Sequence, residues 1–211
     1  MVKAAPKPQK KRAGQYHHGD LRRALIDQAL QTIAKEGAES FTLRGVGDAL
    51  GVSRTALYRH FADKQALIAA VAGEGFRTLR LALLDAWERQ AHGFPGLEAM
   101  GDAYVAFAIA HPAHYRVMFG RFLESVARDP ELVEEARGAF QALVDALLEL
   151  QREGLARPDD PLTQARFVWS VVHGIAMLAI DGQLNDCHDN GAGLVEYSAQ
   201  RIRAAITTAR I

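Results

Sequence analysis

The sequence lacks the residues on which several classes of protein depend. Its 211 residues include one cysteine, Cys187, which excludes an intramolecular disulfide and a zinc site built from paired thiolates. No apolar run approaches the ~18 residues that a membrane-spanning helix requires, and the amino terminus is too polar for a signal peptide. We therefore expect a cytoplasmic protein with no membrane partner.

Signals for β-strands and for catalysis are also missing. The sequence shows no nucleophile with its base, no catalytic carboxylate pair, no phosphate-binding loop and no metal-ligand spacing. Glu134 and Glu135 belong to a charged stretch that is typical of a solvated helix face. His17, His18 and Asp20 lie at an expected helix start, where neighbouring side chains point in different directions, which disfavours a metal site. These absences predict an all-α protein that is not an enzyme and has no cofactor.

Lysine is confined to the first third of the chain. Residues 1–70 hold all six lysines and have 12 lysine and arginine residues against 6 acidic ones, a net charge of +6. Residues 71–211 have 13 against 19, a net charge of −6. A positive field at one end attracts phosphates, whereas the acidic remainder repels them. Residues 1–15 have no apolar periodicity, so we expect a disordered basic tail, although such a charge run can also simply solvate the chain.

The clearest positive signal is residues 51–61, which predict a turn followed by a short helix. Gly51 can adopt a positive φ, and Ser53 can cap the free N–H groups of the next helix. Leu57 and Phe61 are four residues apart and face the protein. The opposite face carries Arg54, Thr55, Tyr58 and Arg59. Guanidinium, hydroxyl and phenol groups on one helix face suit the major groove of double-stranded DNA.

Two further helices are predicted before this one. Thr42 is a candidate cap for a supporting helix that is apolar along one face, at Leu43, Val46 and Leu50. Upstream, another apolar stripe ends at Gly37. Its members are Leu25, Ile26, Ala29, Leu30 and Ile33. Three short helices therefore precede residue 62.

With these features, residues 16–71 resemble the DNA-binding domain of the TetR family of bacterial transcription regulators. The resemblance runs position by position from Phe41 to Lys64, and it implies that three side chains face bases and three others contact phosphates. The base-facing positions are Arg44, Arg54 and Thr55, and the phosphate-contacting positions are Tyr58, His60 and Lys64. Thr42, Ser53 and Arg59 complete the predicted DNA-binding set.

The sequence departs from the family pattern at two places. Gly45 and Gly47 fall inside the supporting helix, where each costs ~1 kcal/mol relative to alanine, so this helix is expected to be soft without DNA. Thr55 and Ala56 stand where the family more often has Gly-Thr. The resemblance therefore implies the binding mode but not the operator sequence.

After residue 62 the pattern is helical throughout. Asp129-Pro130 and Asp160-Pro161 each place a capping acid before a proline at the first helical position. A turn is also predicted at Gly93-Phe94-Pro95-Gly96. The predicted helices are 64–92, 96–110, 112–121, 130–154, 161–181 and 193–210, nine in all with the first three. The long helix predicted at 64–92 links a DNA-binding domain at 16–63 to a larger helical domain at 64–211. This architecture is similar to that of the TetR family.

The larger domain resembles the TetR branch named for its Trp and His-Gly element. The segments that carry this resemblance are Trp169-Ser170-Val171-Val172-His173-Gly174, His111-Pro112-Ala113-His114-Tyr115 and Tyr16 to Arg22. Ser170 and Gly174 share a face with small side chains, which permits close helix packing. We expect them at the subunit contact of a homodimer, in a four-helix interface built from helices 161–181 and 193–210.

The neighbouring face predicts a ligand cavity. Trp169, His173 and Met177 recur every four residues and so lie on one helix face. The other predicted wall residues are Tyr104, Phe107, Met118, Phe119 and Phe122. Aromatics, sulfur and one imidazole suit a small apolar organic effector with a single polar group. The alternative is ordinary core, because a stripe of aromatic and methionine side chains usually just packs.

These observations and the resemblance together predict a ligand-responsive repressor. It would bind a palindromic operator as a homodimer and be released by the effector. The alternatives are an activator, or a dimeric DNA-binding protein whose second domain only dimerises. An enclosed, partly polar cavity in the larger domain would favour the sensor, and a filled core would favour the last alternative.

Overall fold

The protein folds into helices joined by short turns, as a computed structural model shows. The structure describes residues 18–37, 40–120, 126, 128–184 and 192–208. Within these ranges the helices are α1 (His18–Glu36), α2 (Leu43–Ala49), α3 (Arg54–His60), α4 (Lys64–Arg89), α5 (Gly93–Ala110), α6 (Pro112–Phe119), α8 (Pro130–Arg152), α9 (Pro161–Ile180) and α10 (Ala192–Ile206). The same ranges contain no strand, only an isolated bridge between Ala156 and Thr207. The predicted all-α class and the nine helices are confirmed for the described chain.

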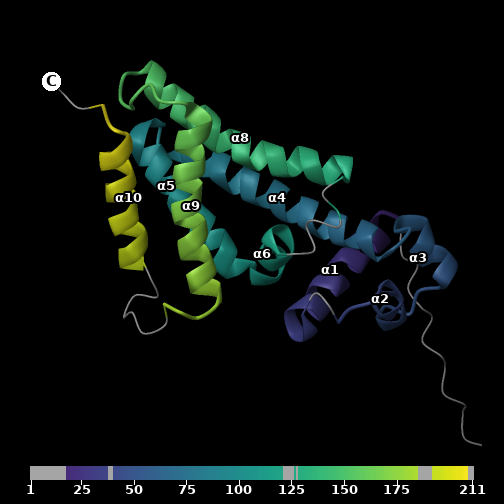
Figure 1. Ribbon diagram of the computed structural model, residues 1–211. Coiled ribbons are helices and arrows are strands. Elements are labelled where there is room, and N and C mark those ends of the chain that lie inside the picture. The colour runs from purple at the N-terminus through teal and green to yellow at the C-terminus, as the bar shows by residue number, and fades with distance from the viewer. Residues whose placement is uncertain (1–17, 38–39, 121–125, 127, 185–191, 209–211) are drawn as a thin grey trace, which may run out of the picture.

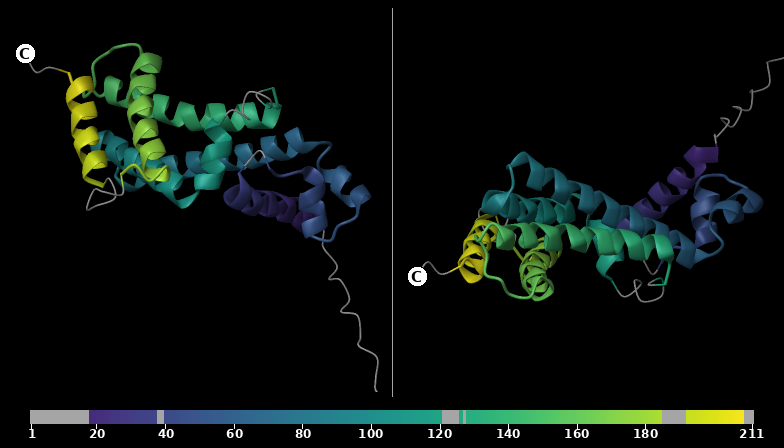
Figure 2. Two further views of the ribbon diagram at one scale, coloured as in Figure 1. Left: turned by 60° about the horizontal axis from the view of Figure 1, so that its bottom comes forward. Right: turned by 90° about the horizontal axis from the view of Figure 1, so that it is seen from above.

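The helices form a small domain and a larger one joined by α4. Figure 1 shows α1, α2 and α3 gathered at one end of the molecule, with α4 running from them into the larger part. There α8 lies along α4, and α9 and α10 stand side by side across the far end. The turned views of Figure 2 show the same arrangement. The small domain is therefore held on the larger one chiefly through α4, with further contacts from α1 to α6.

Local chemistry sets where the best-defined helices begin. The carboxylate of Asp63 accepts from the backbone N–H of Ala66 at 2.8 Å and caps α4. Asp129 and Asp160 cap α8 and α9 in the same way, each before a proline at the first helical position. A side-chain acceptor satisfies an N–H that the helix leaves open, and proline has no N–H to satisfy there. The two predicted Asp-Pro starts are confirmed.

The turn predicted at 93–96 is wrong, because these residues form the first turn of α5. The chain reverses just before, where Ala91, His92 and Gly93 all have positive φ. Pro95 is tolerated in the first helical turn, where N–H groups have no partner inside the helix. A Cβ added at Gly96 would lie 2.7 Å from Trp87 Cε3, so this glycine is needed for close packing of α5 on α4 and does not break the helix. The other predicted helices end within a few residues of the observed ends.

Most large apolar side chains of the described chain are buried along α4 and its neighbours. Leu67, Val71, Leu79, Leu83 and Trp87 of α4 are all buried, which continues one apolar stripe from the small domain into the larger one. No helix in the described ranges is both long and apolar enough to cross a membrane.

Candidate functional site

The helix-turn-helix of α2 and α3 is fixed by local interactions. Thr42 Oγ1 accepts from Gly45 N at 3.0 Å, and Ser53 Oγ accepts from Ala56 N at 3.2 Å. Gly51 between the helices has φ +66°, which side-chain-bearing residues rarely adopt. A Cβ at Gly47 would lie 2.9 Å from Leu57 Cδ2, so glycine at this position lets α2 and α3 approach. Gly47 is one of the two glycines whose helix-propensity cost was counted against α2, and the packing of α2 on α3 requires it.

One face of α3 is turned entirely to solvent. Leu57 and Phe61 are buried at its back, whereas Arg54, Thr55 and Arg59 are exposed and Tyr58 is 54 % exposed. Guanidinium groups can donate two hydrogen bonds to a guanine edge, and the hydroxyl and phenol can reach bases or phosphates. The predicted division between an apolar back and a polar front is present.

The remaining predicted DNA-binding residues lie around this helix. Thr42 and Arg44 of the supporting helix region are exposed, and Arg44 Nε lies 3.7 Å from Asp48 Oδ2. His60 and Lys64 are half-buried, and Lys64 Nζ stands 4.7 Å from the centre of the Phe41 ring. The structure thus brings all nine predicted residues to one end of the molecule. The predicted basic tail, residues 1–15, lies outside the described residues.

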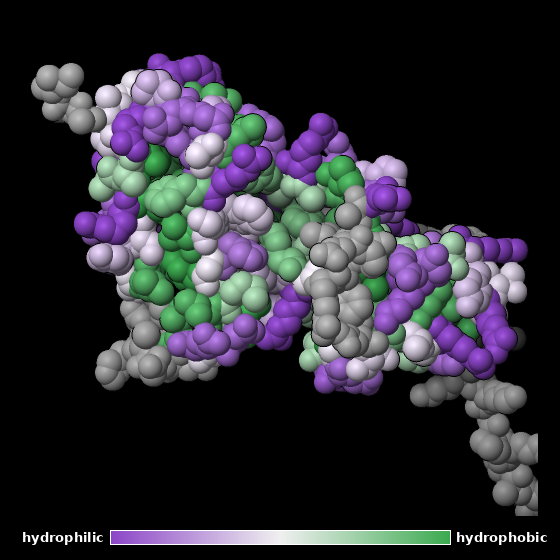
Figure 3. Space-filling model, viewed as in Figure 1, coloured by the Kyte–Doolittle hydropathy of each residue, from purple (hydrophilic) through white to green (hydrophobic). Residues whose placement is uncertain are grey.

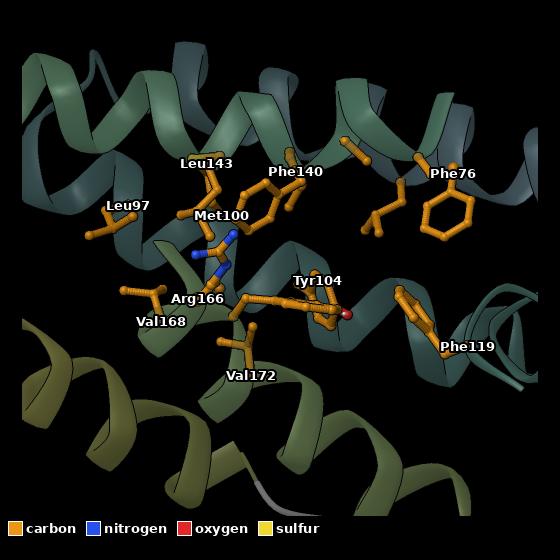
Figure 4. A pocket seen from close by; sticks show the side chains of 16 residues that line it. Phe76, Leu97, Met100, Tyr104, Phe119, Phe140, Leu143, Arg166, Val168 and Val172 are labelled. Carbon is orange, nitrogen blue, oxygen red and sulfur yellow. Dashed lines mark hydrogen bonds between the residues drawn. The ribbon is translucent and has the colours of Figure 1, made fainter. Parts of the chain in front are cut away.

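The larger domain contains a cavity of about 340 Å³ between α4, α5, α8 and α9. Figure 4 shows side chains from all four helices, and from the end of α6, converging on it. The lining residues are Phe76, Leu79, Leu83, Leu97, Met100, Gly101, Tyr104, Phe119, Ala136, Ala139, Phe140, Leu143, Arg166, Val168, Trp169 and Val172. Its size is at the lower end of the ~300–1,000 Å³ usual for ligand sites, and its wall is almost wholly apolar.

Three of the eight predicted wall residues line this cavity: Tyr104, Phe119 and Trp169. Phe122 lies outside the described residues. The other four predicted wall residues, Phe107, Met118, His173 and Met177, do not line the cavity.

The prediction for those four residues is corrected by what each contacts. The Phe107 ring packs 5.1 Å from the His111 ring, and Met118 fills the space left by the missing side chain of Gly75. Met177 is partly buried against the core, and His173 bonds to tyrosines behind the wall. Helical spacing placed His173 and Met177 with Trp169, but the cavity faces only the first part of α9.

Behind Tyr104 lies a chain of hydrogen bonds that includes Tyr115, which the sequence analysis named in the family resemblance but not among the site residues. Trp169 Nε1 donates to the Tyr104 hydroxyl at 3.0 Å, the two tyrosine oxygens are 3.0 Å apart, and Tyr115 Oη is 2.7 Å from His173 Nδ1. Burial lowers the pKa of His173, which favours the neutral ring. The Tyr115 hydroxyl donates to the Tyr104 oxygen, and both tyrosine oxygens lie within hydrogen-bond distance of His173 Nδ1. Burial also raises the pKa of Tyr104 to about 12, so this hydroxyl stays protonated.

The α4, α8 and Arg166 parts of the wall were also missed by sequence analysis. Leu79 and Leu83 were assigned to the apolar stripe of α4, and nothing in that stripe distinguishes a side chain that borders a cavity from one that fills a core. Arg166 could have been found, because it precedes Trp169 by three residues and so lies on the same face of α9.

A second feature of the larger domain is an exposed apolar surface on α9 and α10. Phe167 is 43 % exposed and Tyr197 is 58 % exposed, and Leu178 and Leu194 are also exposed. Figure 3 shows hydrophobic side chains gathered over these two helices. Ser170 and Gly174, the predicted contact residues, are exposed among them, and nothing lies within 4 Å of a Cβ added at Gly174. We refer to this surface as the α9–α10 face.

The chain is similar to known regulators along most of its length. Residues 25–71 match the family described as bacterial regulatory proteins, tetR family, and residues 97–202 match the tetracyclin repressor-like C-terminal domain. The HTH-type transcriptional repressor AcnR of Corynebacterium diphtheriae is 28 % identical over 186 residues, which cover 85 % of this chain and 91 % of that protein. An uncharacterized HTH-type transcriptional regulator of Mycobacterium tuberculosis is 26 % identical over 165 residues, or 78 % of this chain and 72 % of that protein.

A solved structure is similar along almost the whole chain. A protein of unknown function from Rhodococcus sp. RHA1 has 32 % sequence identity and a TM-score of 0.81, with 92 % of this chain and 98 % of that one covered. The named relatives are transcription regulators and not enzymes.

Proposed function

The chain belongs to the TetR family of bacterial transcription regulators, and from this premise we propose that it is a homodimeric repressor released from its operator by a small organic ligand. The observation that carries the ligand response is the cavity of about 340 Å³ in the larger domain. A second domain that served only to dimerise would have no need of such a space. The cavity therefore favours a sensor over a DNA-binding protein without an effector.

The exposed face of α3 supports the DNA-binding part of the proposal. Arg44, Arg54 and Thr55 would read base edges, and Tyr58, His60 and Lys64 would contact phosphates. Two such helices in a dimer would enter successive major grooves ~34–36 Å apart on a palindromic site. Bound there, the protein would exclude RNA polymerase.

The α9–α10 face supports the dimer. An exposed apolar surface costs free energy in water, and a twofold copy of the same surface can cover it. The small residues Ser170 and Gly174 allow the helices of two subunits to approach closely.

The helix contacts suggest how the cavity and the small domain communicate. Phe119 at the end of α6 lines the cavity, while α6 also packs against α1 of the small domain. Arg23 of α1 pairs with Glu74 of α4, and Arg22 pairs with Glu131 of α8 at 3.7 Å. A ligand that displaced Phe119 would move α6 and α4 against α1. A coupling of ~1–3 kcal/mol between the two sites would lower operator affinity ~5–150-fold.

The proposal is tested by selecting bound duplexes from a random DNA pool with the purified protein. We expect a palindromic site whose half-sites are centred about one helical turn, or a multiple of it, apart. Sedimentation velocity at micromolar concentration should show a dimer. A monomer under those conditions, or selected sequences without twofold symmetry, would contradict the proposal.

A further inference from the structure

The cavity wall contains one charged side chain, Arg166 in the second turn of α9. All other lining residues are apolar or aromatic, with Tyr104 and Trp169 the other members that carry polar side-chain atoms. Figure 4 shows the guanidinium reaching from α9 toward Met100 and Leu143, with Leu97 and Val168 beyond it on the side away from Phe76 and Phe119. Phe76 and Phe119 lie at the opposite end. The cavity is therefore polarised, with a cation in the half away from Phe76 and Phe119 and hydrocarbon along the rest.

This guanidinium is exposed and forms no ion pair with an acid in the described part of the chain, although Asp160 on the same helix lies close enough to feel its charge. No carboxylate there lies within 4.0 Å of it, and no hydrogen bond to it is formed, whereas Arg80, Arg116 and Arg157 each pair with an acid. Asp160, on the same helix, caps α9 through Thr163 N at 2.8 Å and Thr163 Oγ1 at 2.6 Å. An arginine cannot lose its charge at accessible pH, so a cation remains available to whatever fills the cavity.

The polar atoms of Tyr104 and Trp169 do not compete for a charged group. Trp169 Nε1 and the Tyr115 hydroxyl both donate to the Tyr104 oxygen, and the Tyr104 hydroxyl lies 3.2 Å from His173 Nδ1. An anion placed there would have to displace an existing hydrogen bond and lie among apolar atoms, which is costly. A cation would meet no acidic side chain anywhere on the wall.

From these observations we infer that the cavity binds an amphipathic organic carboxylate, with its head group on Arg166 and its apolar body extending toward Phe76 and Phe119. The two oxygens of a carboxylate match the planar fork of a guanidinium. Leu83 and Phe76 on α4 are seven residues apart, which gives the apolar part a length of about 10 Å at ~1.5 Å per residue. The inference rests on the proposed ligand response and specifies the class of ligand.

The test compares probes that share an apolar chain and differ in the head group. Decanoate, 1-decanol and decyltrimethylammonium are titrated by calorimetry into the full-length protein and its Arg166→Gln variant. Decanoate should bind the parent protein about tenfold or more tightly than 1-decanol, and the trimethylammonium probe most weakly, because hydrogen bonds between ionised partners are about twice as strong as neutral ones.

The Arg166→Gln variant should bind decanoate no better than 1-decanol, with 1-decanol itself unchanged. Retained binding of 1-decanol shows that the variant is folded. Arg77→Gln is the matched control, since Arg77 is an exposed arginine on α4 next to Phe76 that does not line the cavity. It should preserve the preference for decanoate.

Equal affinity for decanoate and 1-decanol, or a preference that survives in Arg166→Gln, would overturn the head-group assignment and leave the apolar cavity in place. Failure of every probe to bind would overturn the assignment together with the ligand response on which it rests. Operator selection is independent of both results, so a failure of the DNA-binding proposal is seen separately.

Discussion

Arg23 of α1 forms an ion pair with Glu74 of α4, and the Glu74 side chain is only 10 % exposed. The same guanidinium reaches Asp27 on its own helix at 3.0 Å. The small domain is thus tied to the long connecting helix by a carboxylate that water hardly reaches. Screening by solvent is weaker at such a site than at an exposed pair, so the contact should contribute measurably to stability.

Glu74→Gln is predicted to lower the free energy of unfolding by about 1 kcal/mol, because a neutral amide replaces a partly buried charge partner. Denaturant unfolding followed by circular dichroism measures this change. Asp85→Asn breaks the exposed Arg89–Asp85 pair within α4 and is the control, with an expected change below about 0.5 kcal/mol. Equal effects of the two substitutions would argue against a special role for the Arg23–Glu74 contact.

Arg54→Ala and Lys64→Ala are predicted to differ in kind. Arg54→Ala removes a proposed base contact, so it should cost about 1–3 kcal/mol on the selected operator and relax sequence preference. Lys64→Ala should weaken binding to all duplexes. It should also reduce by about one the slope of the logarithm of the affinity against the logarithm of the salt concentration. Fluorescence anisotropy over a range of salt concentrations and two DNA sequences separates the outcomes. If neither substitution changes operator binding, the assigned DNA-binding surface is wrong.

His114 is predicted to make the fold sensitive to acid. Burial, then the charges of His111 and Arg23, lower its pKa from 6.5 to about 4, and its Nε2 is buried without a hydrogen-bond partner in the described structure. The unfolded chain therefore binds a proton below pH 6.5 that the folded chain does not, and stability is lost as the pH falls from about 6.5 toward 4. The loss attributable to this group is about 2 kcal/mol by pH 5, at about 1.4 kcal/mol per pKa unit.

His114→Gln should remove that part of the pH dependence, since glutamine does not titrate. Unfolding free energies at pH 7.5 and pH 5 for both proteins give the difference directly. Identical pH dependence in the two proteins would show that His114 is not the group responsible. His173, whose pKa burial also lowers, contributes in the same direction and is present in both.

Gly47→Ala is predicted to destabilise the small domain although alanine favours helix. The new Cβ would lie 2.9 Å from Leu57 Cδ2 and 3.5 Å from Val52 Cγ2, and Leu57 is only 1 % exposed, so any shift of its side chain disturbs the packed core. Overpacking of this kind costs ~1–3 kcal/mol, which exceeds the ~1 kcal/mol gained from helix propensity. The thermal unfolding midpoint checks the sign. An increase in that midpoint would show that α2 and α3 can separate without cost.

Gly174→Gln is predicted to weaken the proposed dimer and leave the subunit folded. Nothing in the same subunit lies within 4 Å of a Cβ at this position, so the larger side chain disturbs only what covers the α9–α10 face. The dissociation constant from sedimentation should rise about tenfold or more, or ~1.4 kcal/mol. Ala106→Gln, at an exposed position of α5, is the control. An unchanged dimer in Gly174→Gln would place the subunit contact elsewhere.

The small domain could be predicted from sequence because its structure is encoded locally. Thr42 and Ser53 cap the helices that immediately follow them, and Gly51 supplies the turn between, so each signal lies within a few residues of its effect. The apolar positions Leu57 and Phe61 identify the buried side without knowledge of the neighbours. The same locality made the Asp-Pro helix starts predictable.

The cavity was only partly predictable, because it exists between helices that are far apart in sequence. Whether Phe119 or Phe107 lines it depends on how α6 and α5 are rotated against α4 and α8, and a residue pattern along one helix does not contain that rotation. Gly96 was misassigned to a turn for a related reason. Its packing partner, Trp87, is on another helix.

The length of α4 has a mechanical consequence. With 26 residues it is a rod of about 39 Å, at ~1.5 Å per residue, that has one end beside the cavity and the other at the helix-turn-helix. Pivoting such a lever by about 5° carries its far tip through ~3 Å. A displacement of that size in each subunit is comparable to the spacing of neighbouring base pairs. A shift of about 1 Å in α4 beside a bound ligand would therefore be enough to misalign the two α3 helices with successive major grooves.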